Sequence, residues 1–108
     1  MSIAVNLYYH GQNGSARAFA AEMEQSGVAA AIRAEAGNLK YQYFCPLDDP
    51  ETVLLLDVWR DQAAIDAHHN SPMMADLAAL RVKYDLHMTA ERYQSIDAPA
   101  ADAQFLRK

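Results

Sequence analysis

The residues best suited to chemistry lie in one stretch near the middle of the chain, between Asp57 and Pro72. Asp57 and Trp59 end an apolar run, and His68 follows in the next segment. Because an imidazole gains and loses a proton near neutral pH, His68 is the candidate general base, and Asp57 is a candidate acid to orient it. Trp59 would supply an aromatic wall with one N–H donor. This stretch therefore indicates proton abstraction from a small molecule.

Three further polar side chains come from segments with the alternation of strands. Asn6 and Tyr8 belong to residues 3–10, and Tyr43 belongs to residues 39–45. Asn6 could donate its amide N–H to a substrate oxyanion. A buried amide without a partner costs about 1 to 3 kcal/mol, so Asn6 is not easily explained as filler in an apolar strand. Tyr8 and Tyr43 are candidate substrate-binding residues, although side chains alternate between the two faces of a strand and need not all point one way.

Each candidate also has a structural interpretation. His68 could hydrogen-bond a backbone carbonyl at its helix end, and Trp59 could be core packing. Asn6 could bond the backbone at a strand edge, and Asp57 could form an ion pair, including one across a dimer. His68 and His69 are adjacent, and adjacent helical residues point about 100° apart, so they do not readily ligate one ion. We expect neither a metal nor a cofactor.

Composition limits the class of protein. A chain of 108 residues with 52% hydrophobic residues is typical of one globular domain. The formal net charge of −5, without a Lys/Arg cluster, argues against a nucleic-acid or anionic-membrane partner. The substrate should therefore be a small molecule that is neutral or bound by a local cation. No apolar run is long enough to span a membrane, and the single Cys45 suggests a reducing compartment, so we expect a cytoplasmic protein.

Periodicity predicts the order of the elements. Strands are expected at residues 3–10, 39–45, 52–59 and 86–93, with one helix over residues 15–33 that has a weak point at Gly27. Asp61 is a plausible N-cap for a short helix, and Ser71 for another that has Pro72 at its first position. The order β-α-β-β-α-β predicts an α+β ferredoxin-like fold with a four-stranded antiparallel sheet, over residues 1–96, followed by a C-terminal tail at 97–108.

The strand at residues 52–59 is apolar on both phases, so a monomer would expose an apolar patch on the face that the helices leave open. We therefore expect a homodimer in which two sheets pack face to face about a two-fold axis. The tail could be disordered, or could lie on the partner through Phe105 and Leu106.

The order and spacing of several motifs resemble a known family over roughly residues 3–94. They are Glu35–Tyr41, Asp49-Pro50, Asp57–Asp61, Ala64–His68 and Ser71-Pro72. The chain resembles the antibiotic biosynthesis monooxygenase domain, a branch of the dimeric α/β-barrel superfamily. The resemblance implies a pocket between sheet and helices in each subunit, with Asn6, Trp59 and His68 at positions where active members carry pocket residues.

The chain also departs from the family pattern. Asp57 stands where the family usually has Glu, and Met73 stands where a second histidine often follows the proline. The later helix reads Asp76-Leu77-Ala78-Ala79-Leu80, without the axial histidine of the haem-degrading branch. Haem ligation from that position is not expected.

What the resemblance implies about function is a cofactor-independent monooxygenase acting on a small aromatic, phenolic or quinol substrate. Such chemistry needs an anion electron-rich enough to pass an electron to dioxygen, held dry and oriented by the protein. Two other functions remain open because fold alone does not choose between them. One is a non-catalytic ligand-binding dimer, and the other is a proton-transfer isomerase that uses His68 on a small carbonyl compound.

Overall fold

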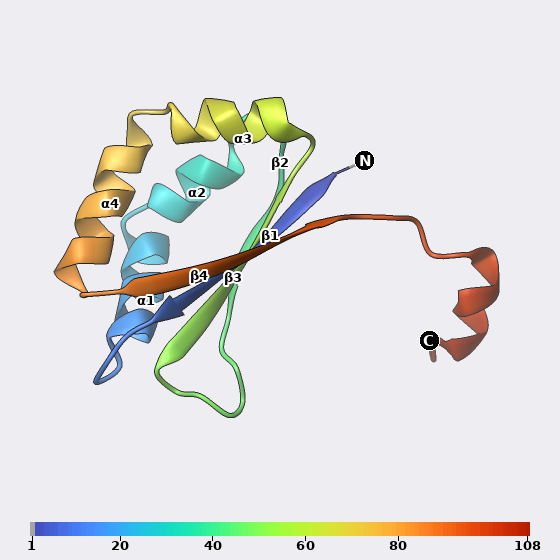
Figure 1. The fold of residues 1–108 in the computed structure, drawn as a ribbon, viewed down its shortest axis with the longest axis horizontal. Coiled ribbons are helices and arrows are strands. Elements are labelled where there is room, and N and C mark those ends of the chain that lie inside the picture. The colour runs from blue at the N-terminus through green and yellow to red at the C-terminus, as the bar shows by residue number, and fades with distance from the viewer. Residues whose placement is uncertain (1) are drawn as a thin grey trace.

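A computed structural model describes residues 2–108 of the chain. Its four antiparallel strands lie in the order β2-β3-β1-β4. The strands are β1 (Ile3–His10), β2 (Asn38–Phe44), β3 (Thr52–Trp59) and β4 (His87–Gln94). The helices α1 (Ser15–Gln25), α2 (Val28–Arg33), α3 (Gln62–His69) and α4 (Met73–Lys83) all lie on one side of the sheet (Figure 1). The predicted ferredoxin-like α+β fold is confirmed.

The single helix predicted over residues 15–33 is wrong, because the chain breaks at Gly27. Helix α1 ends at Gln25, and α2 begins at Val28. Gly27 between them has a φ of 86°, in the left-handed region that a residue without a Cβ adopts without strain. The break redirects the chain, so that α2 leads into the turn before β2.

The two expected caps around α3 and α4 have different outcomes. Asp61 caps α3 as predicted, since its Oδ1 accepts the backbone N–H of Ala64 at 2.9 Å. The Ser71 cap is wrong, because Pro72 occupies the N-cap position and the helix begins at Met73. The side-chain oxygen of Ser71 is buried and has no hydrogen-bond partner among residues 2–108.

The core lies between the helices and the side of the sheet that faces them. Alternate residues of β1 and β3 point toward the helices, and the largest fully buried side chains include Tyr9, Phe19 and Trp59. The rings of Tyr9 and Phe19 pack with their centroids 4.7 Å apart. These contacts bind α1 to the middle strands of the sheet.

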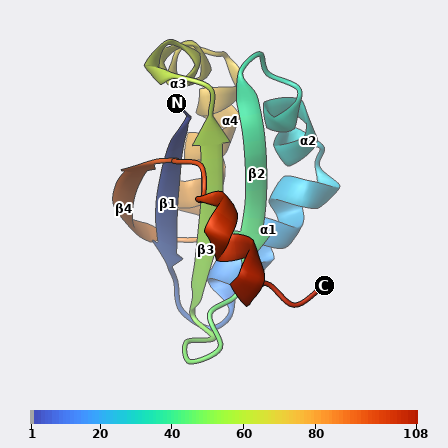
Figure 2. The same ribbon diagram turned by 90° about the vertical axis from the view of Figure 1, so that its right-hand side faces the viewer.

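The helices α1 to α4 leave the opposite face of the sheet uncovered (Figure 2). On this open face, the β3 side chains Leu54, Leu56 and Val58 are only half-buried. The chain continues from β4 into a short 3-10 helix, η1 (Ala100–Phe105), that stands away from the body on this side (Figure 1). Every residue of η1 is exposed. None of the helices in residues 2–108 has the length and apolarity to cross a membrane.

Candidate active site

A cavity of about 300 Å³ lies between the sheet and the helices α3 and α4. Its apolar walls include Val5, Leu7, Leu55, Ile65, Met74 and Leu77. Its polar side chains include Asp57, Trp59, His68 and Arg81. A mostly apolar space with a few convergent polar groups is typical of a small-molecule site.

Three of the predicted site residues meet in this cavity, and three do not. Asp57 and Trp59 are two apart on β3 and share its helix-facing side, and His68 reaches the cavity from α3. Asn6 and Tyr8 lie on the other phase of β1 from the cavity-lining Val5 and Leu7, so they belong to the open face of the sheet. The alternation that separates them is readable in the sequence of residues 3–10.

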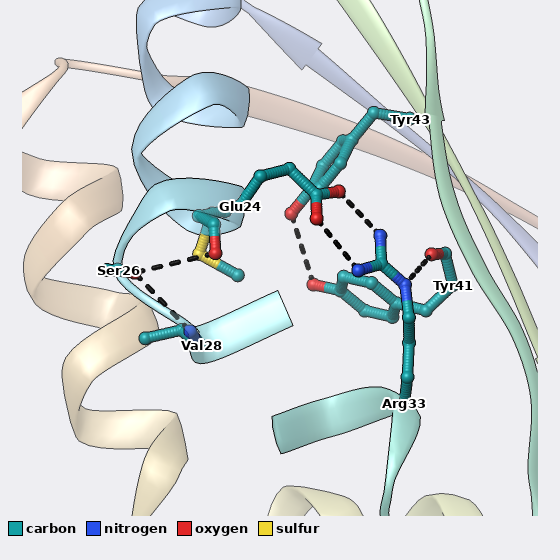
Figure 3. A network of polar contacts seen from close by, with 7 residues as sticks. Glu24, Ser26, Val28, Arg33, Tyr41 and Tyr43 are labelled. Atoms are coloured by element: carbon teal, nitrogen blue, oxygen red, sulfur yellow. Dashed lines mark hydrogen bonds and ion pairs between the residues drawn. The ribbon is translucent and has the colours of Figure 1, made fainter. Parts of the chain in front are cut away.

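The remaining predicted residue, Tyr43, does not line the cavity, and its hydroxyl points toward that of Tyr41 (Figure 3). Its hydroxyl is 3.3 Å from the hydroxyl of Tyr41, which does line the cavity. Arg33 donates from Nε to the carbonyl oxygen of Tyr41 at 2.8 Å and pairs with Glu24. Burial raises the pKa of both tyrosines well above the usual range, so Tyr41 presents a neutral phenol to the cavity.

His68 is buried and held on two sides. Its imidazole stacks on the indole of Trp59, with ring centroids 4.8 Å apart and planes inclined by 30°. Its Nδ1 is 2.7 Å from Oε2 of Glu35, which follows α2. Asp57 was the candidate to orient His68, but the carboxylate that contacts the imidazole in the structure is that of Glu35. Glu35 is far from His68 in sequence, so only the fold brings the two together.

Asp57 is unusual because its carboxyl group is largely buried in an apolar wall. Burial raises the pKa of Asp57 to about 7, and the charge of Glu35 also raises it. The indole N–H of Trp59 and the charge of Arg81 act in the opposite direction and lower this pKa. Near neutral pH, Asp57 is therefore present in both its acid and its base forms.

Arg81 is a cavity residue that the sequence analysis missed. It donates from Nη2 to the hydroxyl of Tyr9 at 3.0 Å, and its guanidinium lies 5.6 Å from the centre of that ring. Its Nε is buried without a hydrogen-bond partner, and among residues 2–108 Arg81 takes part in no ion pair. Arg81 lies four residues after Leu77 on α4. Residues at this spacing share one face of a helix, so the sequence could have indicated that Arg81 faces the sheet together with the apolar Leu77.

His69 and Arg92 lie at the exposed margin of the cavity. Arg92 donates to Oε1 of Gln62 at 2.5 Å. No group of three or more His, Cys, Asp or Glu side chains in the described residues 2–108 is placed to hold a metal ion.

The sequence model of the antibiotic biosynthesis monooxygenase family matches residues 1–80. The chain belongs to this family. The resemblance noted in the sequence is thus confirmed. A comparison with curated proteins found no match.

Solved structures share the fold of this family member. PA3566 from Pseudomonas aeruginosa is 22% identical with a TM-score of 0.74, and the match covers 89% of this chain and 95% of that one. A conserved protein from Methanosarcina mazei Go1 is 18% identical with a TM-score of 0.76, covering 89% and 94%. SnoaB, a cofactor-independent oxygenase from Streptomyces nogalater, is 12% identical with a TM-score of 0.75, covering 92% and 97%. At these identities the likeness establishes the fold alone.

Proposed function

We propose that this protein is a cofactor-independent monooxygenase of a small phenolic or quinol substrate. The observation that carries the proposal is the convergence of His68, Asp57 and Arg81 on one largely apolar cavity of about 300 Å³. A cavity of this size suits a one- or two-ring aromatic. The description of SnoaB, a fold relative, as a cofactor-independent oxygenase supports the same reaction class.

The cavity supplies the groups that this reaction needs. His68 takes the phenolic proton, and Arg81 balances the charge of the resulting anion. The anion passes one electron to dioxygen, and the two radicals combine to form a carbon–oxygen bond and a peroxide. His68 returns its proton to the peroxide and then takes the hydrogen of the attacked carbon as the O–O bond breaks. Asp57, in its neutral form, protonates the departing oxygen and regains its proton from His68. One oxygen atom stays on the substrate as a carbonyl, and the other leaves as water with the two hydrogens that the substrate lost.

The presence of Asp57 and His68 in one cavity also fits a second candidate, a proton-transfer isomerase. An acid with a pKa of about 7 and an imidazole that line one cavity can move a proton between two carbons of a carbonyl compound without oxygen. A dimer that binds ligands without catalysis is the third candidate. These differ from the monooxygenase in one measurable respect, because only the monooxygenase consumes dioxygen.

The test is oxygen uptake with a panel of quinols and phenols, including menadiol and an anthrone. We expect uptake that follows enzyme concentration and falls roughly 10²-fold or more in a His68→Gln variant. His87→Gln is the matched control, because His87 is exposed on β4 and does not line the cavity. Absence of uptake across the panel, or full activity of His68→Gln, contradicts the proposal.

We also propose that the protein works as a homodimer joined through the open face of the sheet. Members of this family are typically dimeric. Here Leu54, Leu56 and Val58 lie at the centre of that face, and the exposed Phe44 and Tyr93 extend the apolar surface onto β2 and β4. An apolar surface of this kind is typical of a protein interface.

Light scattering at micromolar concentration tests the dimer. We expect the mass of a dimer for the wild type and of a monomer for Leu56→Asp. Val82→Asp is the control, because Val82 is 81% exposed on α4, on the helical side. The tail is expected to lie on the partner through Phe105 and Leu106, so deletion of residues 97–108 should weaken the dimer. A monomeric wild type would contradict the proposal.

A further inference from the structure

His68 lines two cavities. Besides the candidate active site, it borders a second cavity of about 300 Å³ near the start of α4. This second cavity is also lined by Glu35, Ala36, Ala64, Ala67, Ser71 and Met73. His68 therefore separates the candidate active site from a space that carries its own polar groups.

Glu35 is the residue that links His68 to the second cavity. Its Oε2 lies 2.7 Å from Nδ1 of His68, at the distance of a charge-assisted hydrogen bond. Its Oε1 is buried and has no hydrogen-bond partner among residues 2–108, and the same holds for Oγ of Ser71. Glu35 therefore uses one of its two carboxylate oxygens to bond His68 and leaves the other unpaired.

The contact with Glu35 determines which nitrogen of His68 can act as a base. An ionised carboxylate only accepts hydrogen bonds, so the proton of a neutral imidazole must be on Nδ1. Nε2 is then unprotonated and free to accept a proton. Stacking on Trp59 fixes the plane of the ring, and Glu35 fixes its rotation within that plane.

We propose that Glu35 is the positioning residue of His68. It holds the tautomer in which Nε2 is the proton acceptor. Glu35 does not line the candidate active site itself, and its one hydrogen bond to a residue of that site is with His68. The effect on catalysis rests on the proposed monooxygenase function, whereas the tautomer of His68 does not.

The direct test is nitrogen-15 NMR of the histidine rings in the protein without substrate, just above neutral pH. We expect His68 to carry its proton on Nδ1 and to have an unprotonated Nε2. Glu35→Gln should shift the population toward the other tautomer, because an amide can either donate or accept. Asp48→Asn, which removes an exposed carboxylate from the β2–β3 loop, should leave the His68 signals unchanged.

The same variants are then compared in the oxygen-uptake assay. We expect Glu35→Gln to lower kcat roughly 10²-fold with little change in KM, because the substrate still fits the cavity but the base is misdirected. A proton on Nε2 of His68 in the wild type, or a Glu35→Gln spectrum identical to wild type, overturns the inference. If the NMR result is as expected but no substrate consumes oxygen, the monooxygenase proposal fails and the positioning role of Glu35 stands.

Discussion

The imidazole of His68 lies on the indole of Trp59 with ring centroids 4.8 Å apart, although one residue belongs to α3 and the other ends β3. Trp59 is only 1% exposed, so it gives His68 a rigid support. The same indole also reaches Asp57, two residues earlier on the strand, and lowers its pKa. One buried tryptophan thus contacts both of the groups that we expect to move protons.

The first prediction concerns Trp59→Phe. Loss of the indole N–H should raise the pKa of Asp57 further above about 7, because that N–H favours the carboxylate. The smaller ring should also cost roughly 1 to 2 kcal/mol of unfolding free energy. Carbon-13 NMR titration of the carboxyl group and urea unfolding measure the two effects. Phe19→Leu is the control, since it disturbs the buried core away from the cavity. An unchanged Asp57 titration would contradict this prediction.

The second prediction concerns pH and the stability of the fold. The pKa of Asp57 rises from 3.8 to about 7 in the folded state, so between these values the folded chain binds more protons than the unfolded chain. The contribution of Asp57 to wild-type stability should therefore fall as pH rises from about 4 to about 7 and stay constant at higher pH. Asp57→Asn removes the effect. The unfolding free energy of Asp57→Asn relative to that of the wild type should rise by up to about 4 kcal/mol between pH 4 and pH 7.

Thermal unfolding of both proteins between pH 4 and pH 8 checks the second prediction. Asp48→Asn serves as the control for loss of an exposed carboxylate. Parallel stability curves for the wild type and Asp57→Asn would show that burial does not shift Asp57.

The third prediction concerns Arg81→Gln. Hydrogen bonds to charged groups contribute about 1.5 to 3 kcal/mol, so kcat/KM for a phenolic substrate should fall by about 10- to 10²-fold. The pKa of Asp57 should rise as well, because the Arg81 charge lowers it. Steady-state oxygen uptake measures the first effect. Arg17→Gln, on the exposed side of α1, is the control, and an Arg81→Gln variant as active as wild type would exclude a role in binding the anion.

The fourth prediction concerns Gly37, which adjoins the turn that carries Glu35. Its φ is 83°, and a Cβ there would lie 2.6 Å from the Cβ of Ala64 on α3. Gly37→Ala should therefore cost about 2 to 3 kcal/mol of unfolding free energy, from backbone strain and from the clash. Gly14→Ala is the matched control, because Gly14 has a φ of 79° and open space around a Cβ.

Urea unfolding of these variants tests the fourth prediction. Gly14→Ala should show only the backbone cost of about 1 to 2 kcal/mol. An added Ala64→Gly change should recover part of the Gly37→Ala loss. Equal losses in the two single variants would mean that the contact with Ala64 is unimportant.

The sequence alone predicted the order of the elements well, because local periodicity reports local structure. Strands β1 and β3 begin and end at the predicted residues, and the others lie within one residue of the prediction. The sequence also identified Trp59 and His68 as candidate site residues. The two rings stack because β3, which ends at Trp59, is followed directly by α3, which carries His68. The sequence marked Gly27 as the weak point of the helix over residues 15–33 but not as a break, since the alanine-rich sequence around it favours a continuous helix.

Only the tertiary structure decided the partners of these residues. Glu35 reaches His68 and Arg81 reaches Tyr9 across 33 and 72 positions of the chain, and no local pattern encodes such a contact. The raised pKa of Asp57 likewise comes from its burial among segments that are distant in sequence. Asn6 lies on the open face of the sheet, because consecutive side chains of a strand point to opposite faces and its neighbours Val5 and Leu7 both face the cavity.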